Sequence, residues 1–114
     1  MSVKLSSRQV GDVNVVDVAG RITLGEGSSA LRDALRDMVG KNQKKILLNL
    51  ADVSYIDSSG IGELVSGFTT VTNNGGQLKL LNLTKRVKDL LQITKLYTVF
   101  DVHDDEAAAV RSFT

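Results

Sequence analysis

The sequence predicts a small α/β domain: a mixed, mostly parallel β-sheet with an antiparallel strand at its N-terminal edge and about four helices. Short β-branched or apolar runs alternate with longer segments in which apolar residues recur at helical spacing. Strands that alternate with helices of about 10–15 residues pair in parallel through right-handed crossovers. The length of 114 residues fits one domain, so residues 1–114 are expected to fold as a single unit.

The N-terminal third is expected to form a hairpin followed by a helix. Gly11-Asp12 is a turn signal between two strand-like runs, and the second run, residues 13–18, ends at Ala19-Gly20. Ser28-Ser29 offers hydroxyls that can cap a helix, and Gly40 fits the left-handed residue just past a helix end. Apolar residues between these signals share one helical face: Leu31, Leu35, Met38 and Val39.

The middle of the chain predicts a buried strand, a second helix and another strand. Residues 46–50 are almost continuously apolar, which is typical of a strand buried on both faces. Residues 78–83 form the next strand, after a break at Asn73-Asn74-Gly75-Gly76. Between these strands, one amphipathic helix presents an apolar face: Ile61, Leu64, Val65, Phe68 and Val71.

The C-terminal third predicts two more helices around a last strand. Thr84 is expected to cap a helix, and residues 97–102 are expected to form the strand. Acidic residues 104–106 then lie at the positive end of a final helix. The inward-facing residues of these two helices are expected to be Val87, Leu90, Leu91, Ala107, Val110 and Phe113.

Composition excludes several classes of protein. The chain has no Cys and one His, so it has no thiol nucleophile and no multi-His or thiolate metal site. Its apolar runs are far shorter than the roughly 20 residues of a membrane span, and no signal-peptide core follows Met1. The net charge of +1 supplies no strong attraction to nucleic acid. We therefore expect a cytoplasmic protein that binds neither a membrane nor nucleic acid and holds no metal.

The segment between the buried strand and the second helix carries the most chemical information. Asp57, Ser58 and Ser59 fall at the carboxyl end of the strand, where open α/β sheets meet ligands and partners. Gly60 and Gly62 lack a Cβ, which lets another backbone or a phosphate approach closely. From these residues alone, an ordinary helix cap by Asp57 or Ser58 is the simpler interpretation.

Residues 46–62 as a whole resemble the anti-sigma-factor antagonists, the stand-alone members of the STAS domain family. Later segments agree: Gly75-Gly76 precedes a strand, and Leu83–Val87 with Leu90-Leu91 precedes the last one. The resemblance covers nearly the whole chain. It implies the STAS fold and a partner-switching regulator that is not an enzyme and has no cofactor.

In this family, a kinase-type anti-sigma factor with ATP and Mg²⁺ in its own site phosphorylates the serine directly after the loop aspartate. That residue is Ser58 in this chain. The resemblance implies that the unmodified protein binds the anti-sigma factor and frees a sigma factor, that the phosphorylated form dissociates, and that a PPM-type phosphatase reverses the change. Ser59 is a competing site to which we assign a capping role. The implied partner-binding residues of this loop are Asp57, Ser58, Ser59, Gly60, Ile61 and Gly62.

One position departs from the family pattern. Many members carry Gly-x-Leu-Asp after the second strand, with the acidic residue in the partner-facing surface, whereas this chain has Gly20-Arg21-Ile22-Thr23. Glu26 lies nearby in the sequence but at a different place. Arg21, Thr23 and Glu26 are therefore candidate partner contacts, and a solvated loop explains them about equally well.

Two other functions fit parts of the sequence. A hydrolase that uses Ser58 or Ser59 needs a base, and the single histidine, His103, lies in no recognisable constellation, with Ile56 where a nucleophile elbow has Gly. A non-enzymatic STAS scaffold or ligand-sensing module that regulates another effector is the stronger alternative, distinguished by whether a kinase modifies Ser58. The oligomeric state is left open, a weak homo-oligomer included.

Overall fold

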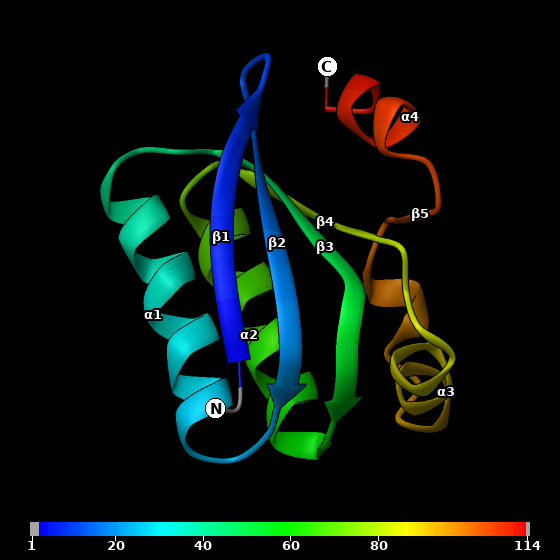
Figure 1. Cartoon of the computed structure of the whole chain (residues 1–114). Helices are drawn as coiled ribbons and strands as arrows, with labels where there is room; N and C mark the ends of the chain where they lie inside the picture. The colour runs from blue at the N-terminus through cyan, green and yellow to red at the C-terminus, as the bar shows by residue number, and fades with distance from the viewer. Residues whose placement is uncertain (1–2, 114) are drawn as a thin grey trace.

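A computed structural model describes residues 3–113, which form one five-stranded sheet with four α-helices (Figure 1). The strands lie in the order β1-β2-β3-β4-β5; β1 is antiparallel to β2 and every other pair is parallel. This arrangement confirms the predicted mixed sheet with an antiparallel N-terminal edge. The elements are β1 (Val3–Val10), β2 (Val13–Ile22), α1 (Glu26–Gly40), β3 (Lys45–Ile56), α2 (Ser58–Asn73), β4 (Gln77–Leu81), α3 (Lys85–Ile93), a 3₁₀ turn (Tyr97–Val99), β5 (Val102–His103) and α4 (Glu106–Arg111).

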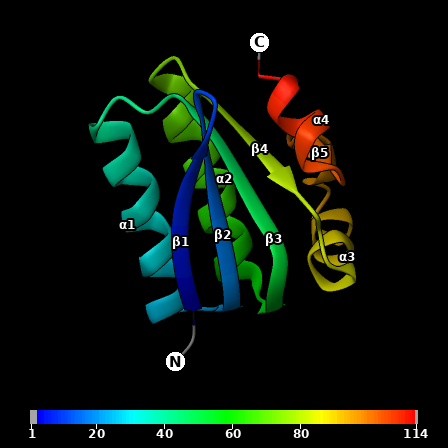
Figure 2. The same ribbon diagram turned by 45° about the horizontal axis from the view of Figure 1, so that its top comes forward.

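Helices cover the sheet unequally on its two faces (Figure 2). Strand residues alternate between faces, so Ile46 and Leu48 enter the larger core with α1, α2 and α3, while Leu47 points the other way. The second, smaller core lies under α4, where Phe113 is 1% exposed. The three apolar residues of 46–48 are all fully buried, as predicted for a strand covered on both sides.

Three strands and one helix have different bounds from those predicted, and one of these strands is β4, which covers Gln77–Leu81 and not residues 78–83. β2 continues past residues 13–18 to Ile22, because Gly20 adopts a positive φ of 101° beside an irregularity in the β2–β3 register. β3 continues past Leu50 to Ile56. The start of α1 predicted at Ser28-Ser29 is wrong: the helix begins at Glu26, and its N-cap is Gly25 without a side-chain hydrogen bond.

Helix ends and the C-terminal strand also differ in detail. Gly40 lies inside α1, and the left-handed residue after it is Asn42, with φ 61°. The strand predicted over residues 97–102 is wrong, since a 3₁₀ turn occupies its first half and β5 pairs through two residues only. Ala107 is exposed and Ala109 takes the buried position that α4 supplies.

Side-chain caps hold the starts of two helices as the sequence predicts. Thr84 Oγ1 accepts a hydrogen bond from the Val87 N–H at 3.3 Å, which caps α3. Asp105 caps α4 by accepting from the Ala108 N–H at 3.1 Å. None of the helices within residues 3–113 is long and apolar enough to cross a bilayer.

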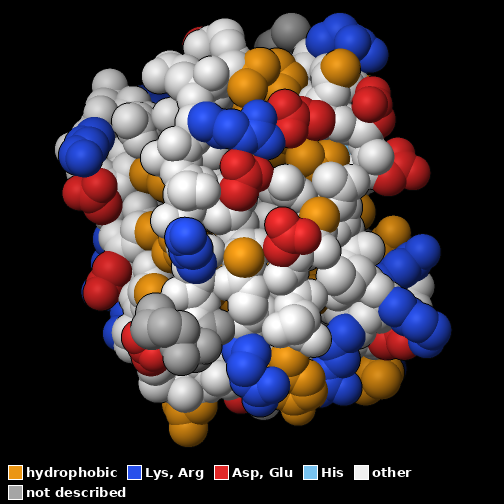
Figure 3. All heavy atoms as spheres, in the orientation of Figure 1, with side chains coloured by type: hydrophobic (Ala, Val, Ile, Leu, Met, Phe, Trp, Pro, Cys, Tyr) orange, Lys and Arg blue, Asp and Glu red, His pale blue; other side chains and the backbone are white. Residues whose placement is uncertain are grey.

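An ion-pair cluster links the N-terminal hairpin to the last helix, and Figure 3 shows basic and acidic side chains next to one another on the upper part of the face that it presents. Arg8 of β1 donates to Asp17 of β2 at 2.7 Å and to Glu106 of α4 at 2.6 Å. These hydrogen bonds lower the pKa of both carboxyl groups below their usual range. The cluster lies away from the carboxyl ends of β2 and β3, which meet at the lower edge of the sheet in Figure 1 and position the candidate site.

Candidate functional site

Asp57 joins the end of β3 to two neighbouring segments. One of its carboxylate oxygens accepts from the Gly60 N–H at 2.9 Å, which caps α2, and the other accepts from the Leu24 N–H at 3.2 Å. The Gly60 N–H, together with the Leu24 N–H, holds the pKa of Asp57 below its ordinary value of 3.8. The carboxylate therefore fixes the loop between β2 and α1 against the start of α2.

The two loop serines have different surroundings. Ser58 is the first residue of α2, is exposed, and has no side-chain hydrogen bond to any residue in 3–113. Ser59 is half-buried, with its hydroxyl 3.2 Å from that of Ser28, which donates to the Thr23 carbonyl at 2.9 Å. The predicted capping role of Ser59 is wrong, because Asp57 supplies the cap and Ser59 instead faces α1.

The glycines of this segment serve different purposes. A Cβ on Gly60 would collide with the Ile22 carbonyl oxygen and lie 2.6 Å from Ile56 Cγ1, so this glycine lets α2 start against the end of β2. A Cβ on Gly62 would meet nothing within 4 Å. Ile61 is 2% exposed. Gly60 and Ile61 are thus buried beneath the loop. Of the predicted contact residues Gly60, Ile61 and Gly62, only Gly62 is exposed.

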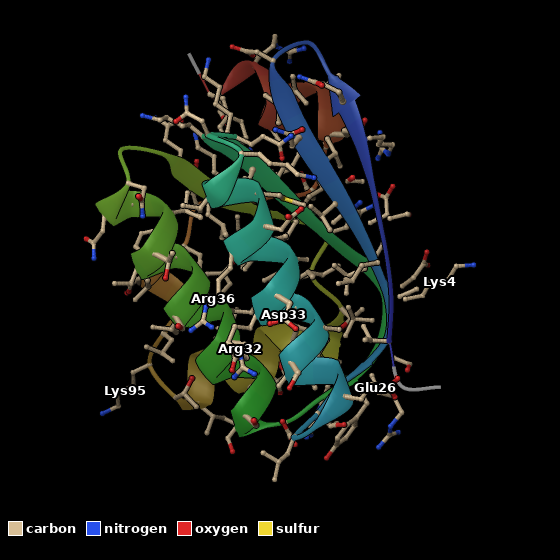
Figure 4. All side chains as sticks on the ribbon, turned by 90° about the vertical axis from the view of Figure 1, so that its left-hand side faces the viewer. Lys4, Glu26, Arg32, Asp33, Arg36 and Lys95 are labelled. Carbon is tan, nitrogen blue, oxygen red and sulfur yellow. The ribbon has the colours of Figure 1, made fainter. Side chains whose placement is uncertain are left out.

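The β2–α1 loop brings the other predicted residues to the same edge. Thr23 is half-buried and its carbonyl accepts from both the N–H and the hydroxyl of Ser28, each at 2.9 Å. Glu26 is exposed in the first turn of α1 (Figure 4). Arg21 is exposed near the end of β2, where its Cα pairs with that of Tyr55.

Leu24 and Arg86 are neighbours of the loop that the sequence analysis missed. Leu24 is 81% exposed, although its backbone is tied to Asp57. Its signal in the sequence is an apolar side chain among glycines and Glu26, outside any strand or helix pattern. Arg86 reaches the site from α3 and has no such local signal, because it comes from 30 residues further along the chain than Ile56, whose carbonyl it binds.

His103 lies apart from the loop serines. Its ring is 3.0 Å from a carboxylate oxygen of Asp101 and 3.4 Å from the Ser112 hydroxyl, on the β5–α4 side of the sheet. The geometry therefore gives Ser58 and Ser59 no histidine base. Within residues 3–113, no three His, Cys, Asp or Glu side chains are grouped so as to hold a metal ion.

A family model described as the STAS domain matches residues 4–109. The chain belongs to the STAS domain family. The anti-sigma-B factor antagonist of Bacillus subtilis (strain 168) is 33% identical over 102 residues, which cover 90% of this chain and 92% of that protein. The resemblance seen in residues 46–62 is thereby confirmed.

Two solved structures share the fold of this STAS domain. The anti-sigma factor antagonist SpoIIAA in its unphosphorylated form has a TM-score of 0.81 at 19% identity, covering 96% of this chain and 95% of that one. The Bacillus cell fate determinant SpoIIAA in its phosphorylated form has a TM-score of 0.76 at 18% identity, covering 97% and 100%. At these identities the likeness shows the architecture alone. What is said of the site therefore comes from the residues of this STAS domain itself.

Gly60→Ala is expected to destabilise the STAS domain. The added methyl group meets a backbone carbonyl that cannot move without shifting β2, so the free energy of unfolding should fall by about 1–3 kcal/mol. Urea unfolding followed by circular dichroism measures the change. Gly62→Ala is the matched control in the same helix turn: it should be neutral or stabilising by up to about 1 kcal/mol. Equal losses in both variants would contradict the close approach at Gly60.

Asp57→Asn is expected to cost stability in a pH-dependent way. A carboxyl group whose pKa is lower in the folded than in the unfolded state stabilises the folded state. This contribution is fully present at a pH above the unfolded pKa of 3.8, and it is lost as the pH falls through the folded pKa. Asn can also cap a helix, so the difference arises from the charge: hydrogen bonds to the ionised acceptor should make wild type more stable than the variant by about 1 kcal/mol at pH 7. Urea unfolding from pH 7 to pH 2 should show the two curves converging below pH 3.8. A difference that is constant across this range would show that ionised Asp57 does not hold the loop.

Proposed function

We propose that this STAS domain is an anti-sigma factor antagonist that acts by partner switching in the cytoplasm and is not itself an enzyme. Its unphosphorylated form binds a kinase-type anti-sigma factor and releases a sigma factor. Phosphorylation of Ser58 ends that binding, and a PPM-type phosphatase restores it. The observation that carries the proposal is the contrast between two adjacent serines, since Ser58 is exposed and unbonded whereas Ser59 is half-buried against Ser28.

Several features support Ser58 as the acceptor. In the transfer, the Ser58 oxygen forms a bond to the γ-phosphorus of ATP, ADP leaves, and the hydroxyl proton passes to a base of the kinase. The product phosphate sits at the start of α2, where the positive end of the helix dipole favours an anion, so the fold need not change. The likeness in fold to an antagonist solved in a phosphorylated form is consistent with this role.

The same phosphate explains a loss of binding. A phosphoserine carries about −1.5 to −2 charges. Beside the ionised Asp57 it would place a hydrated dianion in a surface that a partner must desolvate. Leu24, exposed and bonded through its backbone to Asp57, supplies the apolar part of that surface. The partner-facing surface on this proposal comprises Arg21, Thr23, Leu24, Glu26, Asp57, Ser58, Ser59 and Gly62, with Gly60 and Ile61 beneath it.

Mapping of the modified residue tests the proposal. The purified protein is incubated with ATP, Mg²⁺ and a candidate anti-sigma factor kinase, and its peptides are analysed by mass spectrometry. We expect one phosphate, on Ser58, which Ser58→Ala abolishes and Ser59→Ala retains. Phosphate on Ser59 would move the switch to the neighbouring hydroxyl. Stable binding to the kinase with phosphate on neither serine would favour the scaffold or ligand-sensing function.

Ser58→Asp is expected to weaken binding to the same kinase. A penalty of about 3–4 kcal/mol for the buried extra charge corresponds to an affinity lower by roughly 100- to 1000-fold. Isothermal titration calorimetry against the kinase measures it, and Ser66→Asp, at an exposed position further along α2, is the matched control. A Ser58→Asp protein that binds as tightly as wild type would refute charge as the cause of release.

A further inference from the structure

We propose that Arg86 is the internal receptor for the phosphate of modified Ser58, within a cluster of Arg21, Tyr55 and Arg86 that we call the arginine cluster. The inference rests on the proposed function in that it takes Ser58 as the phosphorylated residue. It adds what the phosphate binds once it is attached. The contact between Arg86 and the phosphate lies within this chain and does not require the partner protein.

The arginine cluster joins three elements around one aromatic ring. The guanidinium carbon of Arg21 on β2 lies 4.7 Å from the centroid of the Tyr55 ring on β3, and that of Arg86 on α3 lies 4.5 Å from the same centroid. Cation–π contact of this kind orients a guanidinium without neutralising it. Figure 3 shows Lys and Arg side chains gathered along the lower edge of this face, over the ends of β2 and β3 and over α3.

Arg86 is held close to the phosphorylation site by a backbone contact. Its Nε donates to the Ile56 carbonyl oxygen at 3.2 Å. Ser58 is two residues further on, so covalent geometry limits that oxygen to about 7 Å from the Ser58 Cα. A phosphate on the exposed Ser58 side chain extends several ångströms from that Cα, and on this proposal rotation of the two side chains closes the remaining gap between its oxygens and the guanidinium.

The donors that would meet the phosphate are free for it. Among residues 3–113, the Ile56 carbonyl is the one hydrogen-bond partner of the Arg86 side chain, which leaves both Nη groups without a partner there. No carboxylate of residues 3–113 pairs with Arg21 or Arg86; the basic residue next to Arg86, Lys85, by contrast pairs with Asp89 at 2.6 Å. A guanidinium with two parallel N–H groups is the side chain best suited to bind phosphate in a bidentate manner.

The charge balance changes with modification. In the unmodified protein the arginine cluster carries two positive charges, and Asp57, the residue after Ile56, carries one negative charge. A phosphoserine dianion held by Arg86 would neutralise the cluster. Phosphorylation would thus alter the surface over β2, β3 and α3 as well as at the loop, while the helix start at Ser58 remains in place.

The phosphate pKa tests the inference. Phosphoserine is placed at position 58 of the full chain during translation, and ³¹P NMR follows its second ionisation. A neighbouring guanidinium favours the dianion, so Arg86→Gln should raise this pKa by about 0.5 or more relative to wild type. Arg36→Gln, which removes an exposed arginine from α1 with the same change of net charge, should leave it unchanged (Figure 4).

A second measurement needs no substitution. In wild type, the ¹H–¹⁵N resonances of the Arg86 side chain should shift on phosphorylation of Ser58, and those of Arg36 should not. An Arg86→Gln protein that is folded by circular dichroism yet titrates like wild type would overturn the inference, as would unmoved Arg86 resonances. Because phosphoserine is installed without a kinase, these outcomes are separate from a failure of the proposed function, which would appear as no kinase-dependent phosphate on Ser58.

Discussion

The carboxylate of Asp57 is the contact on which the geometry of the candidate site depends. It accepts one N–H from the first turn of α2 and one from the β2–α1 loop, so a single side chain sets the relative position of two helix starts and the end of β3. Both N–H groups point at the charge, which is why the folded state favours the ionised carboxyl group. This contact links the backbone of Leu24 directly to the start of α2, where Ser58 lies.

Close backbone approach makes that arrangement possible. Gly60 brings the first turn of α2 against the Ile22 carbonyl, and Gly27 does the same for α1 against the Arg21 carbonyl, where a Cβ would collide in both cases. The two helices therefore begin side by side, which places Ser59 against Ser28 and leaves Ser58 outside. The difference in exposure between two adjacent serines is thus a consequence of backbone packing at the ends of β2 and β3.

The sequence predicted the architecture well because its signals are local. The continuous apolar run at 46–50, the cap at Thr84 and the glycine turn at Gly11 each depend on neighbouring residues alone. The predicted start of α1 and the predicted role of Ser59 were wrong because tertiary contacts decide both. The Ser28 hydroxyl donates a hydrogen bond to the Thr23 carbonyl, so it is not available as a cap. The last strand was predicted too early and too long, over residues 97–102, because the two pairing residues of β5 are too few to show the alternation of a strand.

The arginine cluster likewise could not be predicted from the sequence, because tertiary contacts bring its members together. Arg21 lies two residues before Thr23, the position at which the family pattern has an acidic residue, but its surroundings depend on Tyr55 and on Arg86 from α3. Arg21 and Arg86 place two positive charges over Tyr55 at this edge of the sheet, where Asp57 and Glu26 supply negative ones. On the proposed function, a partner that docks over the arginine cluster would gain from acidic side chains of its own, since opposite charges across an interface favour association. On the further proposal that Arg86 receives the phosphate of Ser58, the anion that ends binding would occupy the charges that such a partner would otherwise meet.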